Sequence, residues 1–192
     1  MLLAQFRPAF VSFIILTVLT GVLYPLFVTG IAQSVFHHQA EGSLIKSSNG
    51  KILGSTLIGQ NFDEPKYFWG RISATSPFYN ASSSTGSNLG SSNPALLDEV
   101  KGRITALKAA DPNNNDPIPV DLVTSSGSGL DPHISLAAAK YQLARVARNR
   151  GLTLDVVQQI IDQNTQGRFL GFIGEPVVNV LQANLALDDY KK

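Results

Sequence analysis

The chain has 192 residues, with 15 Lys and Arg, 14 Asp and Glu and no cysteine. This length predicts one domain, or one domain with an accessory segment, and the lack of cysteine excludes a disulfide scaffold, a thiolate zinc site and a cysteine nucleophile. Only Arg7 among the charged residues precedes position 40, so the rest of the chain carries equal numbers of positive and negative side chains. A domain without net charge lacks the field that holds a phosphate backbone, so nucleic acid is not an expected partner.

An uncharged, strongly apolar stretch occupies residues 8–32. As a helix it would be about 37 Å long, which exceeds the roughly 30 Å of a hydrocarbon layer. Its Phe, Val, Ile and Leu residues contribute about −4 to −8 kcal/mol to insertion, more than the polar residues subtract. We therefore predict a short cytoplasmic N-terminus at 1–7, a transmembrane helix at 8–32 that is kinked at Pro25, and an extracytoplasmic domain at 33–192.

A cleaved secretory signal is the alternative interpretation of this stretch. Arg7 would supply its positive start, and Gly30-Ile31-Ala32 offers a small-residue cleavage site. Signal peptides, however, have apolar regions of about 7–15 residues, so the length favours a retained anchor. Arg7 and the amino terminus favour a cytoplasmic N-terminus by the positive-inside rule, which places the following domain outside.

One face of the predicted span carries small and hydroxyl side chains. Thr17, Thr20, Gly21 and Tyr24 are spaced i, i+3, i+4 and i+7, so a regular helix would align them. Such a face lets a second helix approach closely and offers it hydrogen bonds. Thr and Gly are also common in spans without any such role, and we favour the packing face because the four residues share one spacing.

After the span, the pattern predicts strands first and helices later. Asn49-Gly50 between short apolar runs indicates a hairpin turn, and 56–58, 67–69 and 118–124 are further predicted strands. Residues 76–94 are uncharged and rich in Ser, Asn and Gly, which is typical of a long loop. Helices are expected after the capping residues Asn93, Ser135 and Thr153, and a last one from Pro176. We expect an α+β fold.

No stretch of the sequence matches a catalytic or metal-binding motif. The glycine-containing loops at 84–91 and 125–129 lack the Gly-Lys-Ser/Thr ending of a phosphate-binding loop. Asp131, His133 and Ser135 are crowded into five residues, and turn and capping roles explain them better than a catalytic triad does. His37-His38 has no third ligand nearby, so we expect neither a catalytic constellation nor a metal site.

Polar strings spread along the chain carry a resemblance to a known family. In order, they are residues 54–62 (GSTLIGQNF), 67–75 (YFWGRISAT), 86–94 (GSNLGSSNP), 128–135 (SGLDPHIS), 174–181 (GEPVVNVL) and 184–188 (NLALD). Together with the N-terminal span, their order and spacing resemble the C subunit of the bacterial Kdp potassium-transporting P-type ATPase. The resemblance covers nearly the whole chain.

The resemblance implies a single-pass subunit of a bacterial inner-membrane complex. Its partners would be membrane lipid, a potassium-channel-like subunit and a P-type ATPase subunit, and its role would be to assemble or stabilise these subunits. The family is also described as a catalytic chaperone that raises the ATP affinity of the pump subunit, and its outer domain has been placed over the potassium entrance. ATP and potassium would then bind at the level of the complex, and this chain is not expected to bind a cofactor directly.

Several residues in the matching strings are candidate contacts for a partner or for the ion entrance: Gln60, Asn61, Arg71, Ser73, Asn88 and Asn93. A potassium filter needs neutral oxygens, which the loops that carry these residues could offer. The alternative is that they cap helices and satisfy loop backbone. The function expected is a non-catalytic accessory subunit of an ATP-driven potassium importer, and the alternative function is a stand-alone, membrane-tethered hydrolase or binding module.

Overall fold

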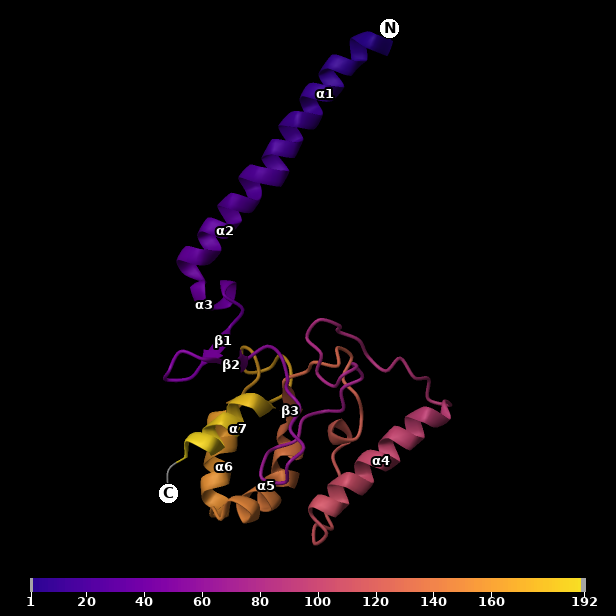
Figure 1. Cartoon of the computed structure of the whole chain (residues 1–192), viewed down its shortest axis with the longest axis vertical. Helices are drawn as coiled ribbons and strands as arrows, with labels where there is room; N and C mark the ends of the chain where they lie inside the picture. The colour runs from indigo at the N-terminus through magenta and orange to yellow at the C-terminus, as the bar shows by residue number, and fades with distance from the viewer. Residues whose placement is uncertain (1, 191–192) are drawn as a thin grey trace. The chain divides into compact units, whose positions relative to one another are not determined.

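The computed structural model describes residues 2–190 (Figure 1). The chain divides into two compact units, Met1–Ile52 and Leu53–Lys192, and we call the second unit the globular domain. It mixes helices with short strands, which confirms the predicted α+β class. The structural boundary falls within the hairpin, about 20 residues after the predicted end of the apolar stretch at residue 32.

The N-terminal unit is dominated by one continuous helical segment. It comprises helix α1 (Leu2–Val18), a wide π-helical turn η1 (Leu19–Leu23) and helix α2 (Tyr24–Val35), and the short helix α3 (His37–Ala40) follows. Residues Gln5–Val35 are long and apolar enough to cross a membrane, and the large apolar side chains along them are exposed. Exposure on all sides is expected of a helix whose solvent is lipid.

The wide turn accompanies the proline in this helix. Pro25 has no N–H, and in a regular helix its ring would clash with the carbonyl of Gly21. The turn just before it is π-helical, and the Tyr24 N–H donates to the Leu19 carbonyl five residues earlier. The predicted disturbance at Pro25 is therefore present as a widened turn on its N-terminal side.

The predicted hairpin forms at the boundary between the units. Strands β1 (Leu44–Lys46) and β2 (Ile52–Ser55) make a two-stranded sheet. Gly50 has φ +81°, and its N–H donates to the Ser47 carbonyl at 2.8 Å. Glycine suits this position because side chains disfavour positive φ.

The helices of the globular domain lie in two places, and three of the four predicted helix starts are confirmed. Figure 1 shows α5, α6 and α7 side by side and α4 apart from them. Asn93, Ser135 and Thr153 each cap a helix with a side-chain oxygen, and Gly151 ends α5 in the left-handed conformation. The helices are α4 (Pro94–Ala110), α5 (Leu136–Arg150), α6 (Leu154–Gln163) and α7 (Val180–Asp189).

A small antiparallel sheet lies against these helices, and the sequence did not predict it. Its strand order is β3-β5-β4, comprising β3 (His133–Ser135), β5 (Val177–Asn179) and β4 (Thr165–Gln166). The prediction of a helix starting at Pro176 is wrong, because Val177–Asn179 pairs on both sides and Asn179 then caps α7. Strands are therefore interspersed among the helices in the second half of the chain, in the order β3, α5, α6, β4, β5 and α7.

The other predicted strands are also wrong. Residues 56–58 form a turn, 67–69 belong to no strand, and 118–124 contains the 3₁₀ helix η2 (Val120–Leu122). For 67–69 the reason is that side-chain amides take the place of a partner strand. Asn184 accepts from the Phe68 N–H at 2.8 Å and donates to its carbonyl at 2.9 Å.

A second amide holds the next residue in the same manner. The Gln142 Oε1 accepts from the Trp69 N–H at 2.8 Å, and its Nε2 donates to the Trp69 carbonyl at 3.1 Å. Phe68 and Trp69 are buried in the main core cluster. Two helices, α5 and α7, thus bind one extended segment through side chains that satisfy its buried backbone groups.

Arg145, which is buried in the core, also binds the extended segment. Its side chain is 1% exposed and donates to the carbonyls of Pro65 and Tyr67 and, at 2.6 Å, to the Gln142 Oε1. Its guanidinium carbon lies 4.8 Å from the centroid of the Trp69 ring. Burial lowers the pKa of Arg145 to about 10, so the group remains charged at neutral pH and is stabilised by carbonyl oxygens and the indole.

Candidate functional site

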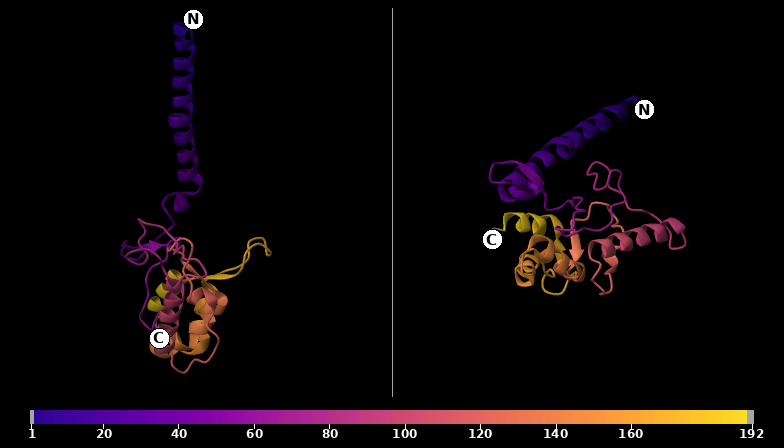
Figure 2. Two further views of the ribbon diagram at one scale, coloured as in Figure 1. Left: turned by 90° about the vertical axis from the view of Figure 1, so that its right-hand side faces the viewer. Right: turned by 60° about the horizontal axis from the view of Figure 1, so that its bottom comes forward.

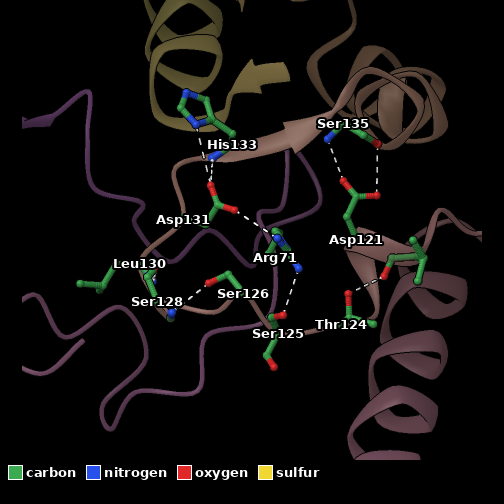
Figure 3. Close-up of polar contacts among 12 residues, drawn as sticks. Arg71, Asp121, Thr124, Ser125, Ser126, Ser128, Leu130, Asp131, His133 and Ser135 are labelled. Carbon is green, nitrogen blue, oxygen red and sulfur yellow. Dashed lines mark hydrogen bonds and ion pairs between the residues drawn. The ribbon is translucent and has the colours of Figure 1, made fainter. Parts of the chain in front are cut away.

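The triad residue types near α5 have structural roles. In Figure 3 the Ser135 hydroxyl donates to Asp121 at 3.1 Å, and it accepts from the Ala138 N–H at 3.0 Å as the cap of α5. Asp131 accepts from the His133 N–H at 2.9 Å, which is a turn contact. No hydrogen bond between Ser135 and His133 is found in the described structure, and the interpretation as turn and capping residues is confirmed.

Arg71 connects the extended segment after Trp69 to the loop before β3. Its Nη1 lies 3.2 Å from Asp131 Oδ2, and its Nη2 donates to the Ser125 carbonyl at 3.0 Å (Figure 3). The Nε atom is buried and has no hydrogen-bond partner in the described structure. The two ion-pair side chains are 27% and 28% exposed, so solvent still screens the pair and its contribution to stability is modest.

A cavity of about 380 Å³ lies beside α4 and brings together three of the predicted contact residues. Asn61, Arg71 and Ser73 line it, whereas Gln60, Asn88 and Asn93 do not. Its charged lining consists of Arg71 and Arg103 together with Asp98 and Glu99 from α4. We call this space the α4 cavity.

The Ser73 hydroxyl forms hydrogen bonds that stabilise a loop. Its hydroxyl donates to the Gly129 carbonyl at 2.6 Å, accepts from the Tyr79 N–H at 2.9 Å and lies 2.9 Å from Thr75 Oγ1. The residue is buried. A hydroxyl with these partners has little capacity left for a ligand, so the backbone-satisfying alternative describes Ser73.

The candidates outside the α4 cavity have local contacts as well. Gln60 donates to the Leu53 carbonyl at 2.8 Å, and Asn93 accepts from the Ala95 N–H at 3.0 Å as the cap of α4. Asn88 is exposed, and its φ of +52° is a conformation that Asn tolerates well. A partner-contact role for these residues stays a prediction.

Arg103 and Tyr79 also line the α4 cavity. Arg103 donates to the Leu122 carbonyl at 3.0 Å and to the Gly70 carbonyl at 2.8 Å. The Tyr79 hydroxyl donates to the Arg71 carbonyl at 2.7 Å, and burial raises its pKa to about 12. At neutral pH this phenol is a fixed hydrogen-bond donor and cannot act as a base.

The raised pKa of Tyr79 predicts a pH dependence of stability. Between pH 10 and about 12 the unfolded chain loses this proton while the folded chain keeps it, so the free energy of unfolding falls as pH rises through that window. Tyr79→Phe should make this fall shallower. Urea unfolding at pH 9 and pH 11 measures it, with the exposed Tyr190→Phe as the control. An unchanged slope in Tyr79→Phe would contradict the assignment.

The predicted packing face of the span is divided by the wide turn. Because a π turn contains one residue more than an α turn, Tyr24 is rotated by about 100° from the position that would align it with Thr17. The Thr20 hydroxyl donates to the Leu16 carbonyl at 2.7 Å, and a Cβ added at Gly21 would meet no atom within 4 Å. Two residues of the face, Thr20 and Tyr24, still line one shallow groove. Its other lining residues are Leu19, Leu23 and Phe27. Its role in helix packing stays a prediction.

Residues 2–190 include no group of three His, Asp or Glu side chains placed to bind a metal ion. His37 Nδ1 lies 3.1 Å from Gln33 Oε1, one helical turn earlier.

Three polar residues that hold the globular domain together were not singled out from the sequence. These are Arg145, Gln142 and Asn184. They are polar residues that share a helix face with buried apolar residues such as Val146 and Leu181, and the dense aromatic run at 67–69 was the signal that this face needs polar partners.

The structure thus combines an exposed apolar helix, long enough to cross a membrane, with a small domain in which Ser73, Gln142 and Asn184 bind backbone groups of the domain itself. The family model of the K+-transporting ATPase c chain (KdpC) matches residues 6–189. The chain therefore belongs to the family of c chains of the K+-transporting ATPase. This confirms the resemblance and the coarse role that it implies, an accessory subunit in potassium transport.

Relatives from several organisms are similar along almost the entire chain. Proteins named potassium-transporting ATPase KdpC subunit are 61% identical over 188 residues in Paraburkholderia xenovorans and 62% identical over 187 residues in Herpetosiphon aurantiacus. The alignments cover 97% of both chains in the first case, and 97% of this chain and 96% of the relative in the second. A relative in Polaromonas naphthalenivorans is 64% identical over 186 residues, which is 96% of this chain and 94% of the relative.

Proposed function

We propose that the chain is a non-catalytic subunit that assembles or stabilises the potassium-channel-like subunit and the ATP-hydrolysing subunit of a potassium importer. The observation that carries this proposal is the family match across residues 6–189, which includes the apolar helix and the globular domain alike. The domain uses three polar side chains for hydrogen bonds within itself, which supports a structural role more than a catalytic one. They are those of Ser73, Ser135 and Asp131.

The proposed location is the bacterial inner membrane, with one span, a cytoplasmic N-terminus and the globular domain outside. Arg7 is the only charged residue before the span, which supports this orientation. In this topology the domain cannot touch cytoplasmic ATP. An increase in the ATP affinity of the pump subunit, the chaperone role, would be a coupling between separate sites through the span or the partner subunits, typically 5- to 150-fold in affinity.

Co-purification and topology mapping test the proposal together. Purification through a tag on the pump subunit should retain this chain in detergent, and added protease should reach the globular domain in intact spheroplasts but not in sealed inverted vesicles. A chain that purifies alone, with a hydrolytic activity of its own, would favour the stand-alone module. Cleavage of the domain in inverted vesicles would overturn the orientation and would make direct contact with ATP possible.

Gly21→Leu should weaken assembly if the face of the span that carries Thr20 and Gly21 packs against a partner helix. A Cβ at this position meets nothing within 4 Å in the chain itself, so the leucine is expected to leave the isolated helix intact and to obstruct only a close neighbour. We expect several-fold less chain to be retained with its partners. Gly30→Leu is the matched control, since Gly30 also has open space around it. Equal retention of both variants would count against the packing face.

A further inference from the structure

A hairpin at residues 167–174 projects from the globular domain between β4 and β5 (Figure 2, left view, in gold). Phe169 and Ile173 exchange two backbone hydrogen bonds of 2.9 Å. Leu170 and Gly171 reverse the chain at its tip with φ of +53° and +83°. These bonds give the hairpin a defined frame, and we call it the 167–174 hairpin.

An ion pair closes the base of the hairpin. One nitrogen of Arg168, Nη2, contacts both carboxylate oxygens of Glu175, at 3.0 Å and 2.8 Å. Because these two charges neutralise each other and 169–174 contains none, the whole projection has no net charge. A frame that is set before binding loses less conformational entropy when a partner is bound.

The hairpin presents its large apolar side chains to solvent. Phe169, Leu170 and Phe172 are 69%, 70% and 72% exposed, and Ile173 is 49% exposed. Apolar residues scattered singly over a surface need no explanation, but large ones gathered on a single projection mark an interaction site. The domain buries Phe68 and Trp69 of its other aromatic run almost completely, so this exposure is not forced by the lack of a core.

We propose that the 167–174 hairpin docks into an uncharged, apolar recess on another subunit of the same complex. The proposal rests on the proposed function, which supplies such a subunit. The four side chains offer roughly 400–600 Å² of apolar surface, since one aromatic side chain buries about 150–250 Å². A standard interface buries about 800 Å² on each partner, so the hairpin can form the centre of one. Large aromatic and aliphatic anchors at such a centre usually carry most of the binding energy.

The composition of the hairpin favours a protein recess over a lipid surface. Protein segments that bind anionic membranes carry unpaired Lys or Arg, and interfacial segments commonly carry Trp or Tyr. Residues 167–175 contain no Lys, Trp or Tyr, and Arg168 is neutralised by Glu175. The span holds the domain close to its partner subunits and so raises their effective concentration, which lets a contact of this modest size suffice.

Photocrosslinking in the assembled complex tests which surface covers the hairpin. Benzoylphenylalanine replaces Phe172 in one variant and Val120 in the control, which is 71% exposed at a different place on the domain. Irradiation of native membranes should give an adduct between this chain and another subunit, in at least about tenfold higher yield from position 172. Adducts with lipid only, adducts between two copies of this chain, or equal yields from the two positions would each overturn the inference.

A pair of double variants measures how much the contact contributes. Phe169→Asn with Phe172→Asn should reduce the fraction of chain retained with its partners after detergent washing by about tenfold, whereas Leu57→Asn with Val120→Asn, at similarly exposed positions, should not. Urea unfolding midpoints matching the unmodified chain would show that both double variants fold. If the two double variants are retained equally, the hairpin inference fails and the proposed function stands. If the unmodified chain is not retained at all, the proposed function itself fails.

Discussion

Replacing Arg145 by methionine is expected to lower the free energy of unfolding by about 3–5 kcal/mol, the range found when one partner of a buried polar network is removed. Methionine fills much of the same space but donates no hydrogen bond, so the carbonyls of Pro65 and Tyr67 lose a buried partner. The contact between the guanidinium and the indole of Trp69 is lost as well.

The measurement of this change is direct, because Trp69 is the single tryptophan of the chain and lies against Arg145. Urea unfolding followed by its fluorescence should show a midpoint shift far larger than for Lys140→Met, an exposed control on the same helix. Similar midpoints for Arg145→Met and Lys140→Met would show that water or neighbouring side chains replace the guanidinium without loss.

Asn184→Leu should cost about 2–4 kcal/mol, since it removes one acceptor and one donor from buried backbone groups. Both the N–H and the carbonyl of Phe68 depend on this amide, and Phe68 is 0% exposed, so water cannot substitute without opening the core. Gln182→Leu, at an exposed position on the same helix, is the matched control and should change the free energy of unfolding by less than about 0.5 kcal/mol.

A double-mutant cycle with Gln142→Leu would extend this result. Gln142 and Asn184 hold adjacent residues of one extended segment from two different helices. Once one amide is lost, the segment is already partly released, so the second substitution should cost less than it does alone. Strict additivity would mean that the two amides act on independent pieces of backbone.

Where local chemistry alone decides the conformation, the sequence was sufficient. Asn49-Gly50 predicted the turn between β1 and β2 because a positive φ is needed there and glycine supplies it. Asn93, Ser135 and Thr153 predicted helix starts because their side chains satisfy N–H groups only two or three residues away. All of these contacts lie within a few residues along the chain.

The predictions that failed depend on contacts between distant parts of the chain. Residues 67–69 have the composition of a strand, yet their backbone partners are amides more than 70 residues later. Val177–Asn179 follows Pro176 as a helix start would, yet two strands flank it and the helix begins only at Val180. In both cases, several buried hydrogen bonds to distant parts of the chain outweigh the local preference of the segment for a strand or a helix.

By itself, the sequence determined the apolar N-terminal helix, the α+β character, the starts of α4, α5 and α6, and the family. These follow from hydrophobicity, capping and short polar strings, which are properties of neighbouring residues. Only the tertiary structure decided that Arg145 is buried and that the Ser73 hydroxyl is hydrogen-bonded within a loop. It also decided that the 167–174 hairpin, with its two phenylalanines, projects from the domain. Whether a side chain is buried or exposed depends on which distant elements cover it, and no pattern of neighbouring residues records that.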